Sequence, residues 1–289
     1  MSGKVPATVA IFLLIGSMGW TAQGTVAQEP LVIAHRGASA YAPEHTFASW
    51  DRALELGADF IELDLQMTRD GELVVLHDEE LDRTARGPQQ ECTGLVRERT
   101  LRQIQRCDVG AWFNAQHPDR ARDEFVGLAI PTLRQVLERY GLGTRYYIET
   151  KNPEAAPGME EELLRLLGQH GLLTEPETNR IIIQSFYAAS LIRIHALYPG
   201  LPLVQLVPDG ETSASIRQSL EQARAYATGI GPEQHDVDEP LVAAAHEVSL
   251  WVHPYTVNTA ESMQRLLDLG VDGMFTDRPD LLRRVLEGR

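Results

Sequence analysis

Two histidines in the chain are candidates for proton transfer. His35 ends an apolar run and is followed directly by Arg36, and His77 ends a second β-branched run. Imidazole has a pKa near neutral, so a histidine pair can supply both the base for a nucleophile and the acid for a leaving group. The guanidinium of Arg36 suits a phosphate, because it offers two parallel donors. A lone histidine is more often structural, so this interpretation depends on where the fold places both rings.

Three carboxylates follow strand-like runs and could hold a cation. Glu62 and Asp64 are two residues apart, as are Glu149 and Lys151, so each pair shares one face of an extended strand. Acids gathered at one place repel each other unless a cation lies between them, and oxygen-only ligands are typical of Ca²⁺ or Mg²⁺ rather than zinc. We therefore predict a divalent-cation site at Glu62, Asp64 and Glu149. A solvated strand end is the plainer alternative, which the recurrence on separate strands disfavours.

Short β-branched runs alternate with stretches of helical period along most of the chain. We expect strands at about residues 31–35, 59–67, 145–151, 180–185, 202–207, 226–230, 249–256 and 272–276. We expect helices at about residues 46–57, 131–140, 159–171, 188–197, 213–224, 239–247, 259–269 and 279–287. This α/β alternation is typical of a TIM (β/α)8 barrel, in which functional residues lie at the C-terminal ends of the strands.

One further run, residues 72–77, follows the second strand after only three residues. A parallel crossover needs about a dozen residues, so this connection has to be a β-hairpin. Asp70 and Gly71 form a favoured two-residue turn. A turn centred on these two residues would place His77 directly opposite Asp64.

Residues 80–128 have little periodicity and contain both cysteines of the chain, Cys92 and Cys107. We expect a small inserted cap over the barrel mouth; a linker or disorder is the alternative, which Trp112 and Phe113 disfavour. In an oxidising compartment a disulfide between the cysteines is favoured over two free thiols. Their spacing is not one that binds metals.

The first residues have the layout of a secretory signal. Lys4 is the only charge before Glu29, residues 5–20 are apolar, and residues 25–27 are small enough for cleavage. We expect a signal peptide at residues 1–27, a mature domain at 28–289, and a secreted or periplasmic location. An uncleaved membrane anchor is the alternative, which the short apolar run disfavours.

The formal net charge of −15 restricts the possible partners. It argues against nucleic-acid binding and against stable association with anionic membranes. A small-molecule substrate is the expected partner, and the sequence has no signal for the oligomeric state. Because this charge repels phosphate, any phosphate substrate requires cations at the site itself.

Several motifs, taken in order, resemble the signature of the glycerophosphodiester phosphodiesterases, over about residues 31–282. The motifs are His35-Arg36-Gly37, Pro43-Glu44-His45-Thr46, Glu62-x-Asp64, Asp70-Gly71, His77-Asp78, Glu149-Thr150-Lys151, Gln184-Ser185-Phe186, Thr256-Val257-Asn258, and Gly270-Val271-Asp272-Gly273 with Thr276-Asp277.

This resemblance implies a metal-dependent hydrolase in which His35 and His77 are the general acid and base and Arg36 binds phosphate. The implied substrates are deacylated phospholipids such as glycerophosphocholine, which are cleaved to sn-glycerol 3-phosphate and an alcohol. The family usually has Asn where this chain has His45, so we expect altered hydrogen bonding near the site with the same chemistry. The residues expected to contact the substrate are Lys151, Glu44, Gln184, Phe186, Trp251 and Asn258.

Two other functions are possible for such a barrel. A phospholipase C or D that acts on intact lipid would need an exposed apolar rim, for which the insertion offers only Trp112 and Phe113. A non-catalytic binding protein would be expected to lack a histidine or a metal carboxylate, and none is missing.

Overall fold

The computed structural model of the protein describes residues 29–288, so the predicted signal peptide lies outside the described residues. Eight parallel strands follow the order β8-β7-β6-β5-β4-β2-β1-β9. Hydrogen bonds from the Asp272 amide to the Val252 carbonyl (3.1 Å) and from the Phe275 amide to the Pro254 carbonyl (3.0 Å) join β8 to β9. The predicted TIM barrel is confirmed. The parallel strands are β1 Leu31–Ala34, β2 Phe60–Met67, β4 Tyr146–Thr150, β5 Ile181–Ser185, β6 Leu203–Leu206, β7 Gly229–Gly231, β8 Trp251–Val252 and β9 Gly273–Thr276.

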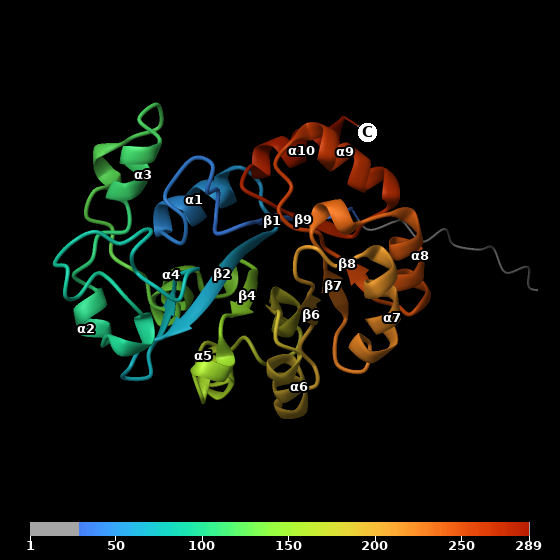
Figure 1. Cartoon of the computed structure of the whole chain (residues 1–289), viewed down its shortest axis with the longest axis horizontal. Helices are drawn as coiled ribbons and strands as arrows, with labels where there is room; N and C mark the ends of the chain where they lie inside the picture. Colours follow the sequence, from blue (N-terminus) through green and yellow to red (C-terminus); the bar gives the residue numbers. More distant parts are fainter. Residues whose placement is uncertain (1–28, 289) are drawn as a thin grey trace, which may run out of the picture.

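A ring of helices surrounds the barrel (Figure 1). Most begin after a Thr or Asp whose side chain accepts a hydrogen bond from the first turn, as Thr46 and Asp238 do. None of the helices within residues 29–288 is long and apolar enough to cross a bilayer. The helices of the ring are α1 Phe47–Glu55, α4 Leu133–Tyr140, α5 Met159–Gln169, α6 Ala188–Leu197, α7 Ser213–Ala223, α8 Glu239–Glu247, α9 Ala260–Leu269 and α10 Pro279–Glu287.

The barrel interior changes from apolar to ionisable along the strands. Alternate residues of a strand face the interior, and the lower ones form one apolar cluster that includes Phe60 and Tyr147. Two residues further along the same strands come Glu62 and Glu149, both buried. The intervening residues, Ile61 and Ile148, belong to the separate core cluster on the helix side of the strands. The strands therefore deliver these carboxylates to the interior at their C-terminal ends.

The hairpin after β2 is present, but its predicted register is wrong by one residue. β3 (Leu73–Val75) pairs antiparallel with β2 so that Leu65 lies opposite Val75, and the Leu76 amide donates to the Asp64 carbonyl (2.9 Å). The loop has three residues instead of two, Arg69 to Gly71. The Gly71 amide donates to the Thr68 carbonyl and closes the turn, and Gly71 then adopts a positive φ of 85°, which adds one residue to the loop. Asp64 is therefore opposite Leu76, and His77 lies just beyond the ladder.

The segment between β3 and α4 lies to one side of the helix ring, next to α1 and α4 (Figure 1). It contains the short helices α2 (Leu101–Ile104) and α3 (Ala111–Gln116). The predicted disulfide is confirmed: Cys92 and Cys107 are bonded, with their Cα atoms 5.5 Å apart. Trp112 and Phe113 are buried in a small cluster of this segment, so neither forms an exposed rim.

Candidate active site

A cavity of about 240 Å³ opens at the C-terminal ends of the strands. Nine of the twelve residues predicted to act on the substrate or a metal line it, whereas Glu44, Asn258 and Trp251 do not. Its polar side includes the buried carboxylates, and its other side is apolar and aromatic. The lining residues are His35, Arg36, Glu62, Asp64, His77, Glu149, Lys151, Gln184, Phe186, Leu206, Tyr255, Thr256 and Phe275.

His35 enters the cavity directly after β1 and is oriented by Asp277, which follows β9. Its Nδ1 lies 2.7 Å from Oδ1 of Asp277, and Ser39 and Asn258 also donate to this carboxylate (2.9 and 2.6 Å). Burial alone would raise the pKa of Asp277, but the His35 ring and the other two donors hold it at about 2. Because Asp277 is ionised, Nδ1 of His35 carries a proton and Nε2 is the nitrogen left for a substrate.

His77 has the same arrangement with the next residue in the chain. Its Nδ1 lies 2.6 Å from Oδ1 of Asp78, and the Gln66 side chain donates to the His77 carbonyl (3.2 Å). Burial lowers the pKa of His77 more than its carboxylate neighbours raise it, which favours the neutral ring. Both cavity histidines thus hold Nδ1 against an aspartate and leave Nε2 available.

Arg36 is held in place by carboxylates at both its backbone and its side chain. It has a positive φ of 56°, its amide donates to Oε2 of Glu62 (2.6 Å), and its Nη1 donates to Oε1 of Glu44 (3.1 Å). The next residue has to be glycine, because a Cβ on Gly37 would lie 2.7 Å from the carbonyl carbon of Ser49. The turn therefore directs both His35 and Arg36 into the cavity.

Three buried carboxylates share the polar side of the cavity with one lysine. Burial, followed by the charges of Asp64 and Glu149, raises the pKa of Glu62 well above its usual range. Burial and Asp64 raise the pKa of Glu149 to about 8, although Lys151 lies 2.9 Å from it. Burial acts in the same direction on Asp64, but Lys151 and His45 lower the pKa of that group. The site has more negative charge than its own cations neutralise.

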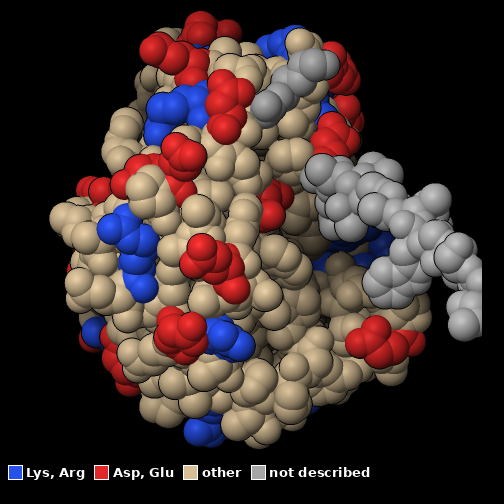
Figure 2. All heavy atoms as spheres, turned by 90° about the vertical axis from the view of Figure 1, so that its right-hand side faces the viewer, with Lys and Arg blue, Asp and Glu red and all other residues tan. Residues whose placement is uncertain are grey.

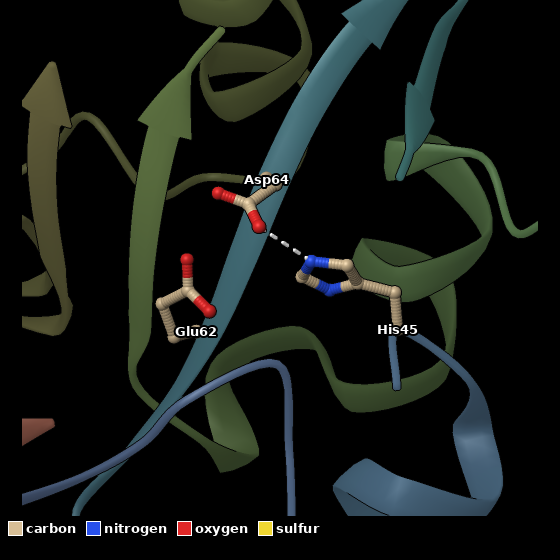
Figure 3. A group of neighbouring side chains, drawn as sticks. All are labelled: His45, Glu62 and Asp64. Atoms are coloured by element: carbon tan, nitrogen blue, oxygen red, sulfur yellow. Dashed lines mark hydrogen bonds and ion pairs between the residues drawn. The ribbon is translucent and has the colours of Figure 1, made fainter. Parts of the chain in front are cut away.

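His45 lies closer to these acids than its position in the sequence indicated. It precedes α1, is buried, and places Nε2 2.7 Å from Oδ2 of Asp64, beside Glu62 (Figure 3). One ligand atom from each of these three residues lies within 4.8 Å of the others, a grouping that could hold a metal ion. The predicted change in hydrogen bonding at His45 is thus a direct bond to a predicted cation ligand.

The donor atoms fit a hard divalent cation. Oδ1 of Asp64 and Oε1 of Gln184 are buried and have no hydrogen-bond partner within residues 29–288. Unpaired buried oxygens beside an excess of carboxylates are costly unless a cation binds them. Glu62, Asp64 and Glu149 remain the candidate ligands, with His45 as an additional one.

The three predicted residues outside the cavity have different positions. Glu44 and Asn258 lie directly behind it, where they orient Arg36 and Asp277. Trp251 is a correction: it begins β8 and lines a separate cavity with Leu31 at the opposite end of the barrel. Strand β8 covers only Trp251–Val252, whereas the sequence predicts a strand over residues 249–256.

Sequence reasoning did not assign Asp78, Asp277, Leu206 or Tyr255 to the site. Asp277 had a readable signal, since it follows β9 at the end where barrels keep functional groups, and Asp78 directly follows the predicted His77. The apolar residues had none, because an apolar residue at a strand end is indistinguishable from a core residue in the sequence.

The surface charge does not favour a phosphate, so the cations in the cavity have to attract it. Figure 2 shows Asp and Glu side chains spread over the face that carries α7 and α8, without a large cluster of Lys or Arg. Arg36 and Lys151 line the cavity itself. The net charge of −15 therefore repels an anion, whereas Arg36 and Lys151 attract it next to the reacting groups.

The fold and this cavity define a TIM-barrel enzyme, a phosphoric diester hydrolase. The chain belongs to the glycerophosphoryl diester phosphodiesterase family, whose sequence model matches residues 35–281.

Relatives and solved structures agree with this assignment. A glycerophosphodiester phosphodiesterase of Bacillus subtilis is 47% identical over 259 residues, which cover 89% of this chain and 87% of that protein. A glycerophosphodiester phosphodiesterase of Caldanaerobacter subterraneus is 36% identical over 87% of this chain and 96% of its own. The structure of an Oleispira antarctica phosphodiesterase in complex with the product sn-glycerol 3-phosphate has a TM-score of 0.73 and 27% identity, and covers 89% of this chain and 97% of that one.

Proposed function

We propose that the chain hydrolyses glycerophosphodiesters to sn-glycerol 3-phosphate and an alcohol, in a reaction that depends on a divalent cation. The observation that carries the proposal is the convergence of two aspartate-oriented histidines, Arg36, Lys151 and three buried carboxylates in one cavity. The product bound to the Oleispira antarctica phosphodiesterase supports the substrate class.

His35 and His77 act as the acid–base pair. With Nδ1 of each ring held by an aspartate, Nε2 of one ring takes the proton from the attacking water, and Nε2 of the other gives a proton to the departing alkoxide. Arg36 and Lys151 hold the phosphate oxygens, where negative charge develops as the bond breaks. The tautomers set by Asp277 and Asp78 support these roles, because an imidazole held in this way has only one nitrogen for the substrate.

Glu62, Asp64 and Glu149 would hold the cation, which when bound neutralises charge on the phosphate and on the acids themselves. Oxygen ligands suit Ca²⁺ or Mg²⁺. Oδ1 of Asp64 supports this assignment, because it is buried, accepts no hydrogen bond within residues 29–288 and has Lys151 only at 4.0 Å.

The apolar side of the cavity would pack the carbon chain of a small substrate. Phe186, Leu206 and Tyr255 lie there, and a volume of about 240 Å³ suits a deacylated molecule better than one with two fatty acyl chains. The alternative of intact lipid lacks support, because Trp112 and Phe113, its predicted membrane rim, are buried.

We further propose that the protein is exported to a secreted or periplasmic location after removal of residues 1–27. The bond between Cys92 and Cys107 supports an oxidising compartment.

The test is release of sn-glycerol 3-phosphate from a panel of glycerophosphodiesters by the purified protein. Activity should be lost in excess EDTA and restored by Ca²⁺ or Mg²⁺. Glu62→Gln should lower kcat on the order of 10²-fold, whereas Glu221→Gln, on the exposed side of α7, should leave it unchanged. Full turnover in EDTA would remove the cation from the mechanism, and no release from any substrate would refute the function.

A further inference from the structure

Arg83, the first arginine of the inserted segment, bonds to two carboxylates at once. Its Nε and Nη2 donate to Asp78 (2.6 and 3.3 Å), and its Nη1 and Nη2 donate to Glu44 (2.9 and 2.6 Å). The guanidinium therefore uses both edges of its fork, each against a carboxylate. Paired charge-assisted bonds of this kind fix orientation as well as adding stability.

Each of these carboxylates holds a residue that lines the cavity. Asp78 accepts from Nδ1 of His77 (2.6 Å), and Glu44 accepts from Nη1 of Arg36 (3.1 Å). A continuous path of hydrogen bonds thus runs from His77 through Asp78, Arg83 and Glu44 to Arg36. Arg83 does not itself line the cavity.

Arg83 supplies a positive charge to both carboxylates of this path. It lies 2.6 Å from Oε1 of Glu44, which also bonds to Arg36, and 2.6 Å from Oδ2 of Asp78, which also bonds to His77. If Arg83 were removed, two acids would face each other without the cation between them.

The inserted segment holds Arg83 in position. The Trp112 ring lies 5.8 Å from the guanidinium carbon, and Trp112 packs with Ala42, close to Glu44 in the β1–α1 loop. The backbones of Arg86 and Asp108 exchange two hydrogen bonds of 2.8 Å, beside the disulfide. The segment is thus packed against the β1–α1 loop, which carries Arg36, and it follows His77 directly in the chain.

We propose that Arg83 is a positioning residue for the hydrolysis: it couples the orientation of His77 to that of Arg36 and links the disulfide-bonded insertion to both of these cavity residues. The inference rests on the proposed function, because it assigns the two coupled residues to proton transfer and phosphate binding.

The test compares Arg83→Met with Arg97→Met in the full mature chain. Arg97 is an exposed arginine of the same segment that forms a single bond to Glu79 (2.9 Å), so it is the matched control. We expect Arg83→Met to lower kcat about 10-fold or more and to weaken product inhibition by sn-glycerol 3-phosphate, because both His77 and Arg36 lose a fixed orientation. Arg97→Met should match the wild type.

A double-mutant cycle with His77→Ala separates positioning from general damage to the fold. Most of the loss caused by Arg83→Met should disappear in the His77→Ala background, because the orientation of an absent ring cannot matter. Arg83→Lys covers the case in which Arg83→Met does not fold. It keeps the charge but not the two-sided fork, so its kcat should fall while its melting temperature stays near that of the wild type.

The inference is overturned if the kcat of Arg83→Met stays within about twofold of the control. Where Arg83→Met does not fold, the same criterion applies to Arg83→Lys. It is also overturned if the variant lowers kcat by the same factor with and without His77. A wild type that hydrolyses no glycerophosphodiester would instead refute the proposed function. The two failures are therefore distinguishable.

Discussion

Nδ1 of His35 lies 2.7 Å from Oδ1 of Asp277, although 242 positions separate them in the sequence. The two residues meet because His35 follows β1 and Asp277 follows β9, and these strands pair in parallel to close the barrel. Asn258 holds the second oxygen of Asp277, so the ring cannot turn without breaking its bond to a carboxylate that is itself fixed. Closing the barrel therefore sets the orientation of one proposed catalytic histidine.

Asp277→Asn should lower kcat by on the order of 10³-fold, while the affinity for the product changes little. An amide can present its NH₂ group to His35 and thereby favour the tautomer with the proton on Nε2, as in serine proteases, where the corresponding change is large. Asp280→Asn is the matched control, because Asp280 lies three residues further on and bonds only outside the cavity, to Tyr41 and Arg284. Normal turnover by Asp277→Asn would show that the aspartate is not needed to orient His35.

Asp277 should also contribute to stability in a defined range of pH. Its pKa is about 2 in the folded protein against 3.8 ordinarily, so its contribution is present above about pH 4 and is lost as the pH falls through about 2. The full contribution is on the order of 2 kcal/mol. Unfolding free energies at about pH 5 and about pH 2.5 should therefore differ less in Asp277→Asn than in the wild type. An equal difference in both proteins would contradict the prediction.

His35 and His77 should behave as a coupled pair. Either change to alanine should lower kcat by ~10²–10⁴, and the double variant should be only slightly worse than the poorer single one, since groups that act as a unit are not additive. His195→Ala on α6 serves as the control. A substrate with a good leaving group should rescue the variant that lacks the acid and not the other. If either single variant keeps near-normal turnover, the two-histidine mechanism is wrong.

Reducing the bond between Cys92 and Cys107 should lower both stability and activity. The two cysteines are 15 positions apart, and a loop of this size contributes ~3 kcal/mol in the chain-entropy model. Activity should fall as well, because the bond holds the segment that positions Arg83. Denaturant unfolding with and without reductant measures the first effect, and turnover at a temperature well below the melting point measures the second. Two alkylatable thiols in the native, oxidised protein would contradict the disulfide.

Some expectations from the sequence were wrong for local reasons. The hairpin register differed by one residue because Gly71 extends the turn, and a slip of one residue moves every side chain to the other face. Trp251 was assigned to the wrong end of the barrel because an apolar run does not indicate where its hydrogen-bonded ladder begins. Both errors concern boundaries, which depend on tertiary pairing more than on residue type.

The sequence by itself determined the barrel and most of the groups in its mouth. Alternation along each strand is a local property, so Glu62 and Asp64, or Glu149 and Lys151, share a face however the strands are arranged. The cavity brings these four together with His35 and His77, as the pattern predicted.

Only the tertiary structure decided which groups touch. The bonds of His35 to Asp277, of His45 to Asp64 and of Arg83 to Glu44 join residues that are 242, 19 and 39 positions apart. A hydrogen bond depends on distances of a few tenths of an ångström, and such distances are set by the closure of the barrel and the packing of the inserted segment. Residue type and spacing contain no information at that scale, because many partners are compatible with each charged side chain until the strands are in register.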